Sequence, residues 1–233
     1  MNRFFLSISK NSNYKVVNYG SAIWSLGDQL GDIHYHPEPF FEDHYDILFR
    51  RKGHIYVPHR KPFDFPGRAT FKHIFFLRDP RDVLVSAFYS FGFTHARPEN
   101  ISNMTRYDEF RNRIRMLGID GYALEASIDW LIPLYDTYKE FRESTEKSIF
   151  LTYDEFKNNR IKFIHTILNF LDVNMSNSDI NLLEESMSPD KGKDGKHIRS
   201  GESNQFHNEL NTDTREILDE RFTEILNYWG FEN

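Results

Sequence analysis

The chain has 233 residues, with 29 lysine or arginine and 35 aspartate or glutamate side chains, so its formal charge at pH 7 is −6. A chain of this length buries about 70–75% of its unfolded surface and needs no disulfide or metal for stability. It contains no cysteine, which excludes disulfides, thiolate metal sites and cysteine nucleophiles and favours a reducing, cytoplasmic location. The acidic balance argues against a nucleic-acid-binding protein, and no apolar run reaches the roughly 18 residues of a membrane span.

Strand and helix patterns alternate along the chain, and we expect one domain over residues 1–233. Residues 3–9 are apolar and aromatic, which predicts a strand that enters a polar loop, and a helix is predicted to follow over residues 13–30. Further strands are predicted at residues 53–58, 71–77 and 148–152. Further helices are predicted from residue 80 and at residues 107–117, 123–142, 161–171, 179–187 and 214–228, with a basic loop at residues 188–205.

This alternation predicts the α/β class, with a mainly parallel sheet covered by helices on both faces. Sheets of this kind bind ligands at the carboxyl ends of their strands. Lys10, His59, Arg78 and Tyr153 all lie at or just beyond a predicted strand end. We therefore expect these four side chains to belong to one site.

One motif predicts an anion-binding site. Arg78 leaves a predicted strand, and Asp79 and Pro80 then supply the N-cap and the first residue of a helix. Free N–H groups at a helix start favour an anion, a neighbouring arginine can bind phosphate, and the Ser86 hydroxyl two turns later adds a donor. From the residues alone, a salt bridge between Arg78 and Asp82 is an equally good interpretation.

The run from Arg78 to Ser86 resembles the motif R-[ND]-P-x-D-x-x-x-S of the sulfotransferases that use PAPS, 3′-phosphoadenosine 5′-phosphosulfate. In that family the motif binds the 3′-phosphate of the donor. The resemblance therefore implies this role for Arg78 and Ser86, with PAPS as the donor and no metal. It also implies a three-layer, P-loop-like fold with a central, mainly parallel sheet flanked by helices.

Two later segments resemble the same family, in the expected order. Residues 197–206 are similar to its R-K-G-x-x-G-D-W loop, which implies that Arg199, Ser200 and Gly201 close over the same phosphate. Without the resemblance, a basic loop with glycines reads as a solvated connector. Tyr153 follows a predicted strand as the tyrosine of the family's Y-E-D-L segment does, which implies contact with the adenine. With the ending at residues 226–231, the resemblance spans nearly the whole chain.

The family's N-terminal loop reads P-K-S-G-T-T-W or P-R-S-G-N-T-W, and it holds the 5′-phosphosulfate much as a P-loop holds phosphates. In this chain Lys10, Asn11, Ser12 and Asn13 take the corresponding places. Ser9 replaces the proline and Ser12 the glycine, and losing that glycine restricts the backbone where the phosphate approaches.

A second register of the same loop uses Gly20 and Ser21. It keeps the glycine but puts Asn18 where the lysine should be. We rank this register second.

Transfer of a sulfuryl group to an alcohol requires in-line placement, cations around the leaving phosphate and a base for the acceptor proton. Histidine suits the last role because its pKa lies near neutrality. His59 matches the histidine of the K-T-H-x-P segment of cytosolic-type relatives, which implies that it is the base. Val57 replaces the lysine of that segment, and Arg60 or Lys61 is a candidate substitute.

Two other segments leave alternatives open. Residues 91–103 either shape the acceptor pocket or form a plain surface loop. A cluster of histidine and acidic side chains has the composition of a metal site, but the prolines within it break regular ligand spacing, and we favour a surface or acceptor-facing loop. The cluster comprises His34, His36, Glu38, Glu42, Asp43 and His44.

The sequence thus predicts a sulfotransferase that moves a sulfuryl group from PAPS to a hydroxyl or amine acceptor, with His59 and Lys10 as catalytic residues. The principal alternative is a non-catalytic nucleotide-binding or interaction protein on the same fold, because Ser9, Ser12 and Val57 depart from the family pattern. An ATP-dependent kinase is a weaker alternative, since the motif G-x-x-x-x-G-K-[ST] is absent. The acceptor partner is left open, because loops that vary freely build such pockets.

Overall fold

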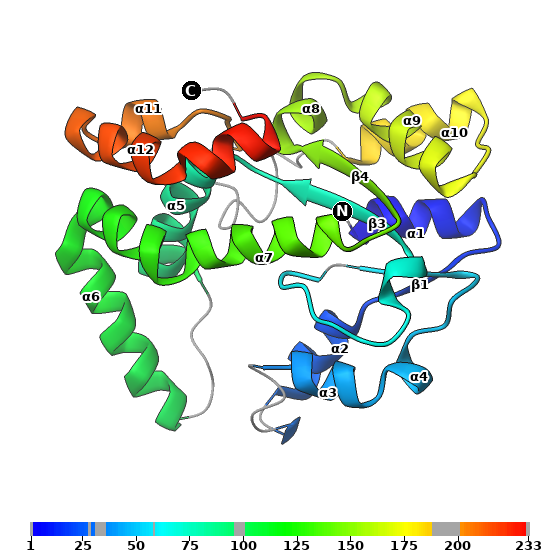
Figure 1. The fold of residues 1–233 in the computed structure, drawn as a ribbon, viewed down its shortest axis with the longest axis horizontal. Coiled ribbons are helices and arrows are strands. Elements are labelled where there is room, and N and C mark those ends of the chain that lie inside the picture. The colour runs from blue at the N-terminus through cyan, green and yellow to red at the C-terminus, as the bar shows by residue number, and fades with distance from the viewer. Residues whose placement is uncertain are drawn as a thin grey trace. The chain divides into compact units, whose positions relative to one another are not determined.

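Two small sheets and the helices around them make up the part of the chain that the computed structural model describes, namely residues 2–27, 29–30, 36–57, 59–95, 101–187 and 201–231 (Figure 1). The chain divides into two compact units, each built from separate stretches. The first unit comprises Met1–Phe76, Thr137–Leu151 and Glu155–Pro189. The second unit comprises Leu77–Asp136, Thr152–Asp154 and Asp190–Asn233.

The first unit carries all four strands, apart from the last residues of β3 and β4. Its elements are α1 (Asn2–Lys10), β1 (Lys15–Val17), α2 (Tyr19–Leu26), α3 (Glu38–Asp43), α4 (Tyr45–Leu48), β2 (His54–Tyr56), η2 (Arg68–Thr70), β3 (Lys72–Leu77), β4 (Lys147–Thr152), α9 (Arg160–Leu171) and α10 (Asn177–Ser186). Helix α8 (Tyr153–Asn158) begins in the second unit and ends in the first. The second unit is helical, with α5 (Pro80–Tyr89), η3 (Ser90–Thr94), α6 (Ile101–Ala126), η4 (Ser127–Leu131), α11 (Phe206–Glu209) and α12 (Thr212–Trp229). Helix α7 (Ile132–Glu143) begins in the second unit and ends in the first.

The N-terminal segment is a helix, so the strand predicted at residues 3–9 is wrong. Phe4, Phe5 and Ile8 lie on one face of α1 and are buried, whereas Leu6 between them is 51% exposed. That spacing follows the helical period rather than the alternation of a strand. The aromatic ring of Phe4 packs against Phe163 of α9, with ring centroids 6.4 Å apart.

The helix predicted over residues 13–30 is replaced by a strand, a tight turn and a shorter helix. Strand β1 pairs in parallel with β2, with Val16 opposite Ile55. Helix α2 then begins at Tyr19, and the side chain of Asn18 caps it by accepting a hydrogen bond of 2.8 Å from the backbone N–H of Ser21. The strand prediction at residues 53–58 is confirmed by β2.

Strands β3 and β4 form the other sheet, and Figure 1 shows their arrows pointing the same way. The side chains of β3 alternate between two layers of helices. Ile74 and Phe76 pack on the core formed with α1, α9 and α10, while His73 and Phe75 contact Phe141 of α7, with ring centroids 5.1 and 6.2 Å apart. Both strands were predicted, and the α/β class is confirmed. Among the described residues the sheet is in two pieces of two strands each.

A second core in the first unit is aromatic. Phe41, Phe49 and Phe63 are buried at its centre, and rings from α2, α3, α4 and β2 pack around them. This cluster holds the segment after β2, where His59 lies.

In the second unit, α6 is interrupted by a kink at Gly118, whose φ of 66° and ψ of 177° lie outside the helical region. Two π-helical turns, η3 and η4, flank α6 in the sequence. Within residues 2–27, 29–30, 36–57, 59–95, 101–187 and 201–231, no helix is both long and apolar enough to cross a membrane.

Candidate functional site

The predicted anion motif lies where β3 ends and α5 begins. The Asp79 side chain caps α5 by accepting a hydrogen bond of 2.8 Å from the backbone N–H of Arg81, and Pro80 is the first helical residue. Proline has no backbone N–H, but none is needed at that position, because the first N–H groups of a helix have no hydrogen-bond partner within the helix. The local sequence therefore places Arg78 between a strand end and a helix start, as predicted.

Among the described residues of the second unit, the Arg78 side chain contacts Asp82, Glu202 and Tyr153. Its Nη2 atom donates to Asp82 Oδ2 at 3.1 Å and to the backbone carbonyl of Glu202 at 2.6 Å. Its guanidinium lies 4.8 Å from the ring centroid of Tyr153. The salt bridge considered from the sequence is therefore present, and the Arg78 side chain still keeps 19% of its surface exposed.

Asp82 joins α5 to the segment Gly201–Phe206. Its buried carboxylate accepts hydrogen bonds from the backbone N–H groups of Asn204, at 2.8 Å, and Phe206, at 3.2 Å. Burial raises the pKa of Asp82, and the charge of Arg78 and the N–H of Phe206 oppose that rise. The sequence interpretation gave Asp82 no role beyond the pairing with Arg78, and the signal was its place one helical turn after the arginine.

Tyr153 and Gly201, both predicted as binding residues, lie together. The Tyr153 hydroxyl donates to the Gly201 carbonyl at 3.0 Å. With Arg78 over the Tyr153 ring, three predicted residues from distant parts of the sequence thus meet in the second unit. Arg199 and Ser200, predicted beside them, lie outside the described residues.

Ser86 is exposed on α5. Residues four apart share a face of a helix, so Ser86 lies one turn beyond Asp82 on the face that Asp82 turns to the Gly201–Phe206 segment. The hydroxyl of Ser86 and the guanidinium of Arg78 therefore follow the same side of α5.

A fully buried arginine of α5 stabilises the start of this helix and the segment that packs on it. Arg81 is 1% exposed, and it pairs with Asp79 at 2.7 Å and with Asp219 of α12 at 2.6 Å. Its guanidinium also lies 4.1 Å from the ring centroid of Phe206. Sequence reasoning did not identify this cluster, because Asp219 is one of 35 acidic residues and the residues next to it in the sequence form no recognisable motif.

The residues predicted for the 5′-phosphosulfate loop lie in the first unit. Lys10 ends α1, and Asn11 follows it with its side-chain Nδ2 donating to the Ser7 carbonyl at 3.1 Å. Ser12 accepts a hydrogen bond of 3.2 Å from the backbone of Tyr14, and Asn13 is exposed. Lys10 is thus the last residue of a helix, and Asn11, Ser12 and Asn13 follow that helix rather than a strand.

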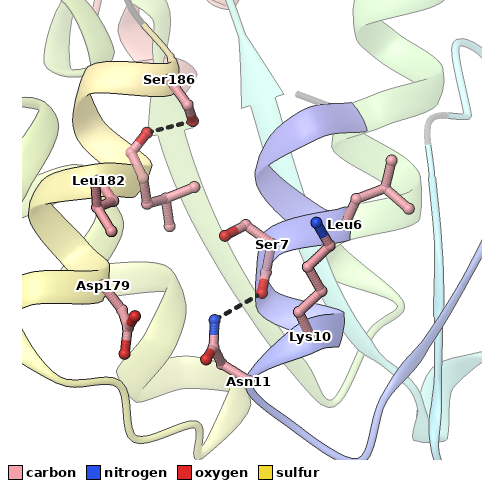
Figure 2. Close-up of a pocket in the computed structure, with 8 residues that line it drawn as sticks. Leu6, Ser7, Lys10, Asn11, Asp179, Leu182 and Ser186 are labelled. Carbon is pink, nitrogen blue, oxygen red and sulfur yellow. Dashed lines mark hydrogen bonds between the residues drawn. The ribbon is translucent and has the colours of Figure 1, made fainter.

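Lys10 and Asn11 line a groove between α1 and α10, of about 350 Å³. Figure 2 shows the Lys10 side chain running back toward Leu6, with Asp179 on the facing helix. By contrast, the strand–turn–helix of this unit lies at Asn18–Ser21, the register ranked second from the sequence.

His59, the predicted base, is exposed as a residue, but its ring is surrounded by Phe41, Phe49 and Phe63 at centroid distances of 5.9, 6.0 and 5.2 Å. This apolar environment penalises the charged imidazolium and lowers the pKa of His59 to about 4. The imidazole is therefore neutral at pH 7, which is the form that can accept a proton.

The histidine-rich segment can be described only in part, because His34 lies outside the described residues. Among the residues that are described, no three histidine, aspartate or glutamate side chains are grouped as a metal site would require. His44 instead stacks on Phe40, with ring centroids 4.4 Å apart.

The fold and the arginine site define an α/β protein in which Arg78 lies in the turn between a parallel strand and a capped helix. The sulfotransferase domain family matches residues 67–230, which includes Arg78, Ser86 and Tyr153 but begins after His59. The chain belongs to the sulfotransferase family. No curated protein matches the sequence significantly.

Solved sulfotransferase structures share the fold. Mouse sulfotransferase SULT7A1 in complex with PAP superimposes with a TM-score of 0.53 at 17% identity, over 78% of this chain and 68% of that one. Retinol dehydratase in complex with androsterone and the inactive cofactor PAP gives 0.54 at 18% identity, over 79% of this chain. A complex of retinol dehydratase with retinol and PAP gives 0.53 at 17% identity, over 78%. The chain spans 56% of the length of both retinol dehydratase chains.

Proposed function

We propose that this protein is a PAPS-dependent sulfotransferase that acts on a hydroxyl or amine acceptor. The observation that carries the proposal is the position of Arg78, which lies at a helix start, over Tyr153, and bonded to the Gly201–Phe206 segment. The structural neighbours, which were crystallised with PAP, support the same donor. A cytoplasmic location stays a prediction from composition.

The residues around Arg78 fit a phosphate. A guanidinium provides a planar pair of donors for phosphate oxygens, and a helix start adds a favourable dipole. The Glu202 carbonyl that Arg78 now contacts is neutral, so a charged phosphate oxygen competes with it effectively. Ser86, Gly201 and, from the predicted loop, Arg199 and Ser200 would complete the 3′-phosphate site.

Tyr153 would contact the adenine. One face of its ring is covered by the Arg78 guanidinium, at 4.8 Å from the centroid, and its hydroxyl is held by Gly201. The tyrosine is thereby fixed before ligand binds, and the remaining ring surface suits a flat heterocycle.

The 5′-phosphosulfate side has two candidate segments, both in the first unit. Lys10, with Asn11, Ser12 and Asn13, supplies a cation, whereas the Asn18–Ser21 turn is the one that follows a strand and opens a helix. Backbone N–H groups at such a turn suit a phosphate, which supports the second segment. Lys10→Ala and Gly20→Ala variants distinguish them, because only the variant in the true loop loses sulfuryl transfer.

His59 would act as the general base. When bound, PAPS supplies the sulfuryl group and PAP leaves as the S–O bond to it breaks. As the acceptor oxygen or nitrogen forms its bond to sulfur, neutral His59 takes the acceptor's proton. The low pKa of His59 keeps the imidazole neutral over the whole neutral pH range, but it also makes the imidazole a weaker base than an ordinary histidine.

Calorimetric titration with PAP tests the donor site. We expect micromolar binding by the wild-type protein and at least a tenfold loss in Arg78→Ala, since one charge-assisted phosphate contact is removed. Arg106→Ala, an exposed arginine on α6, is the matched control and should bind as the wild type does.

The second candidate function is a non-catalytic nucleotide-binding or interaction protein on this fold. It is supported by the helix that ends at Lys10, where the family has a phosphate-binding loop after a strand. Failure of the wild-type protein to bind PAP would favour the interaction protein, and PAP binding without turnover on any acceptor would favour the non-catalytic nucleotide-binding protein. His59→Ala should abolish turnover while PAP affinity is kept, and equal turnover in both proteins would exclude His59 as the base.

A further inference from the structure

A second cavity lies within the second unit, and its walls are mainly aromatic. It has a volume of about 260 Å³, and we call it the aromatic cavity. It is lined by Phe91, Phe110, Tyr122, Glu125, Ala126, Asp129 and Trp130. None of the residues assigned above to the donor or to the base lines it.

Unusual backbone brings these side chains together. Phe91 lies on the π-helical turn η3, and Asp129 and Trp130 lie on the π-helical turn η4. Wide turns of this kind are rare and occur frequently at functional sites. The kink at Gly118 divides α6 between Phe110 and Tyr122, so both halves of the helix contribute a ring.

Two arginines donate hydrogen bonds to the backbone of η3 and so hold this wall of the cavity in place. Arg111 donates to the Phe91 carbonyl at 3.2 Å, and Arg115 donates to the Gly92 carbonyl at 2.7 Å. Phe91 and Phe110 are in tilted contact, with ring centroids 5.9 Å apart. The rings are thus positioned without a ligand, which lowers the entropic cost of binding one.

Two of the side chains that line the aromatic cavity are acidic, while Arg111, Arg113 and Arg115 contact lining residues or their neighbours without lining it themselves. Its lining includes two carboxylates and, among the described residues, no basic side chain. Glu125 is paired with Arg113 at 2.7 Å, whereas Asp129 has no ion pair in the described part of the chain. One carboxylate is therefore available as a counter-charge.

Tyr122 adds a polar group to the wall. The residue is 5% exposed, and its hydroxyl has no partner with ordinary hydrogen-bond geometry among the described residues. Burial raises the pKa of Tyr122 to about 12, and the side chain of Trp130 opposes the rise only in part. The hydroxyl therefore stays protonated at any physiological pH.

We propose that the aromatic cavity binds the ammonium group of a small organic molecule. The faces of aromatic rings attract cations through their quadrupoles, most strongly for tryptophan, and desolvation in a cavity strengthens the attraction. Asp129 supplies the opposite charge at the edge. The proposal concerns binding only, and it holds whether or not the chain transfers a sulfuryl group.

Choline and its uncharged carbon isostere, 3,3-dimethylbutan-1-ol, have the same shape and differ in charge, so together they test the proposal. Each is titrated into the full chain without donor, and the fluorescence of the tryptophans is followed. We expect choline to bind with a Kd of about 1 mM and the isostere at least about tenfold more weakly. Equal affinities, or no saturable signal with choline up to about 20 mM, would overturn the proposal.

Two variants place the binding in this cavity, with binding followed by NMR of the choline methyl groups. Asp129→Asn should weaken choline binding about fivefold, and Trp130→Leu about tenfold, because they remove the counter-charge and the strongest ring. Asp136→Asn, an exposed aspartate on α7, is the matched control for charge and should leave the affinity unchanged. Circular dichroism establishes that each variant is folded. Equal loss in Asp129→Asn and Asp136→Asn would refute the assignment to the cavity.

Discussion

Asp82 holds together the residues that we propose as the phosphate site, through contacts of its own with Arg78 and with the segment Gly201–Phe206. Its two oxygens hold the Arg78 guanidinium and two backbone N–H groups of the segment that faces Arg78. The net rise in its pKa indicates that the effect of burial outweighs these attractions, so the ionised form of Asp82 costs the folded state free energy. Its contribution should therefore be larger for binding than for stability.

Replacing Asp82 by alanine should lower the free energy of unfolding by about 2–3 kcal/mol, because the N–H of Phe206, a residue that is 2% exposed, loses its partner. Asp82→Asn keeps one acceptor oxygen and should cost about 1 kcal/mol. Both should weaken PAP binding at pH 7, since Arg78 loses its ion pair. Urea unfolding and calorimetry measure the two effects, and Asp136→Ala is the control. Identical urea midpoints for Asp82→Ala and Asp136→Ala would contradict this role.

His59 should make the stability of the protein depend on pH. The pKa of His59 in the folded state, about 4, lies below the ordinary value of 6.5, so the folded state binds fewer protons between these values. The contribution of neutral His59 is thus complete above pH 6.5 and is lost as the pH falls toward 4. Between pH 7 and pH 5 we expect the free energy of unfolding of the wild type to fall by about 1 kcal/mol more than that of His59→Gln, after allowance for solvent screening. Urea unfolding measures this difference, and parallel pH profiles of the free energy of unfolding for the two proteins would show that the His59 ring is solvated.

At the scale of elements, the sequence predicted those parts whose local signals agree with their packing. Strand β3 is a continuous apolar run, and Asp79 with Pro80 marks the start of α5 unambiguously. Arg78 and Tyr153 were found because residues at strand ends meet at one edge of a sheet. Each of these features can be recognised from a few residues that are adjacent in the sequence.

The errors have physical causes. Residues 3–9 are short and aromatic enough to suit a strand, although Phe4, Phe5 and Ile8 have helical spacing, and this face of the helix packs on α9 and α10. The three-residue β1 is too short for its alternation to be visible in the sequence. Asp219 was missed because its partner Arg81 lies 138 positions away. The strand β1 and the Arg81–Asp219 pair depend on tertiary packing that local patterns do not encode.

The kink in α6 gives a prediction whose sign depends on backbone conformation. Gly118 has no atom within 4 Å of an added Cβ, so a side chain would fit, but its φ of 66° and ψ of 177° are nearly exclusive to glycine. Gly118→Ala should therefore lower the free energy of unfolding by about 1–3 kcal/mol.

Gly121 is the matched control, because it lies in the same helix with helical geometry. Its added Cβ would lie 3.4 Å from the Leu117 Cβ, an ordinary contact. Gly121→Ala should be neutral or raise the free energy of unfolding by up to about 1 kcal/mol, as expected for alanine in a helix. Urea unfolding compares the two variants, and a stabilising Gly118→Ala would mean that α6 is straight in solution.

At the scale of the whole molecule, the path of the chain bears on whether the two compact units unfold separately. The chain passes from one unit to the other at residues 76–77, 136–137, 151–152, 154–155 and 189–190. Helix α7 and the ends of β3 and β4 cross these points. Neither unit is therefore a continuous stretch that could fold first and alone, which favours the single domain expected over residues 1–233.

Native-state hydrogen exchange tests this expectation. Helix α9 lies in the first unit and α12 in the second, and both carry fully buried side chains, among them Ile164 and Phe222. In one cooperative domain the slowest amides of both helices exchange only by global unfolding, so their opening free energies should agree within about 1 kcal/mol and fall together in urea. If one helix exchanged with an opening free energy several kcal/mol below the other, the units would be separate domains. Each unit's core would then have to account for its own stability, and the arginine site, which lies wholly within the second unit, would be expected to survive unfolding of the first.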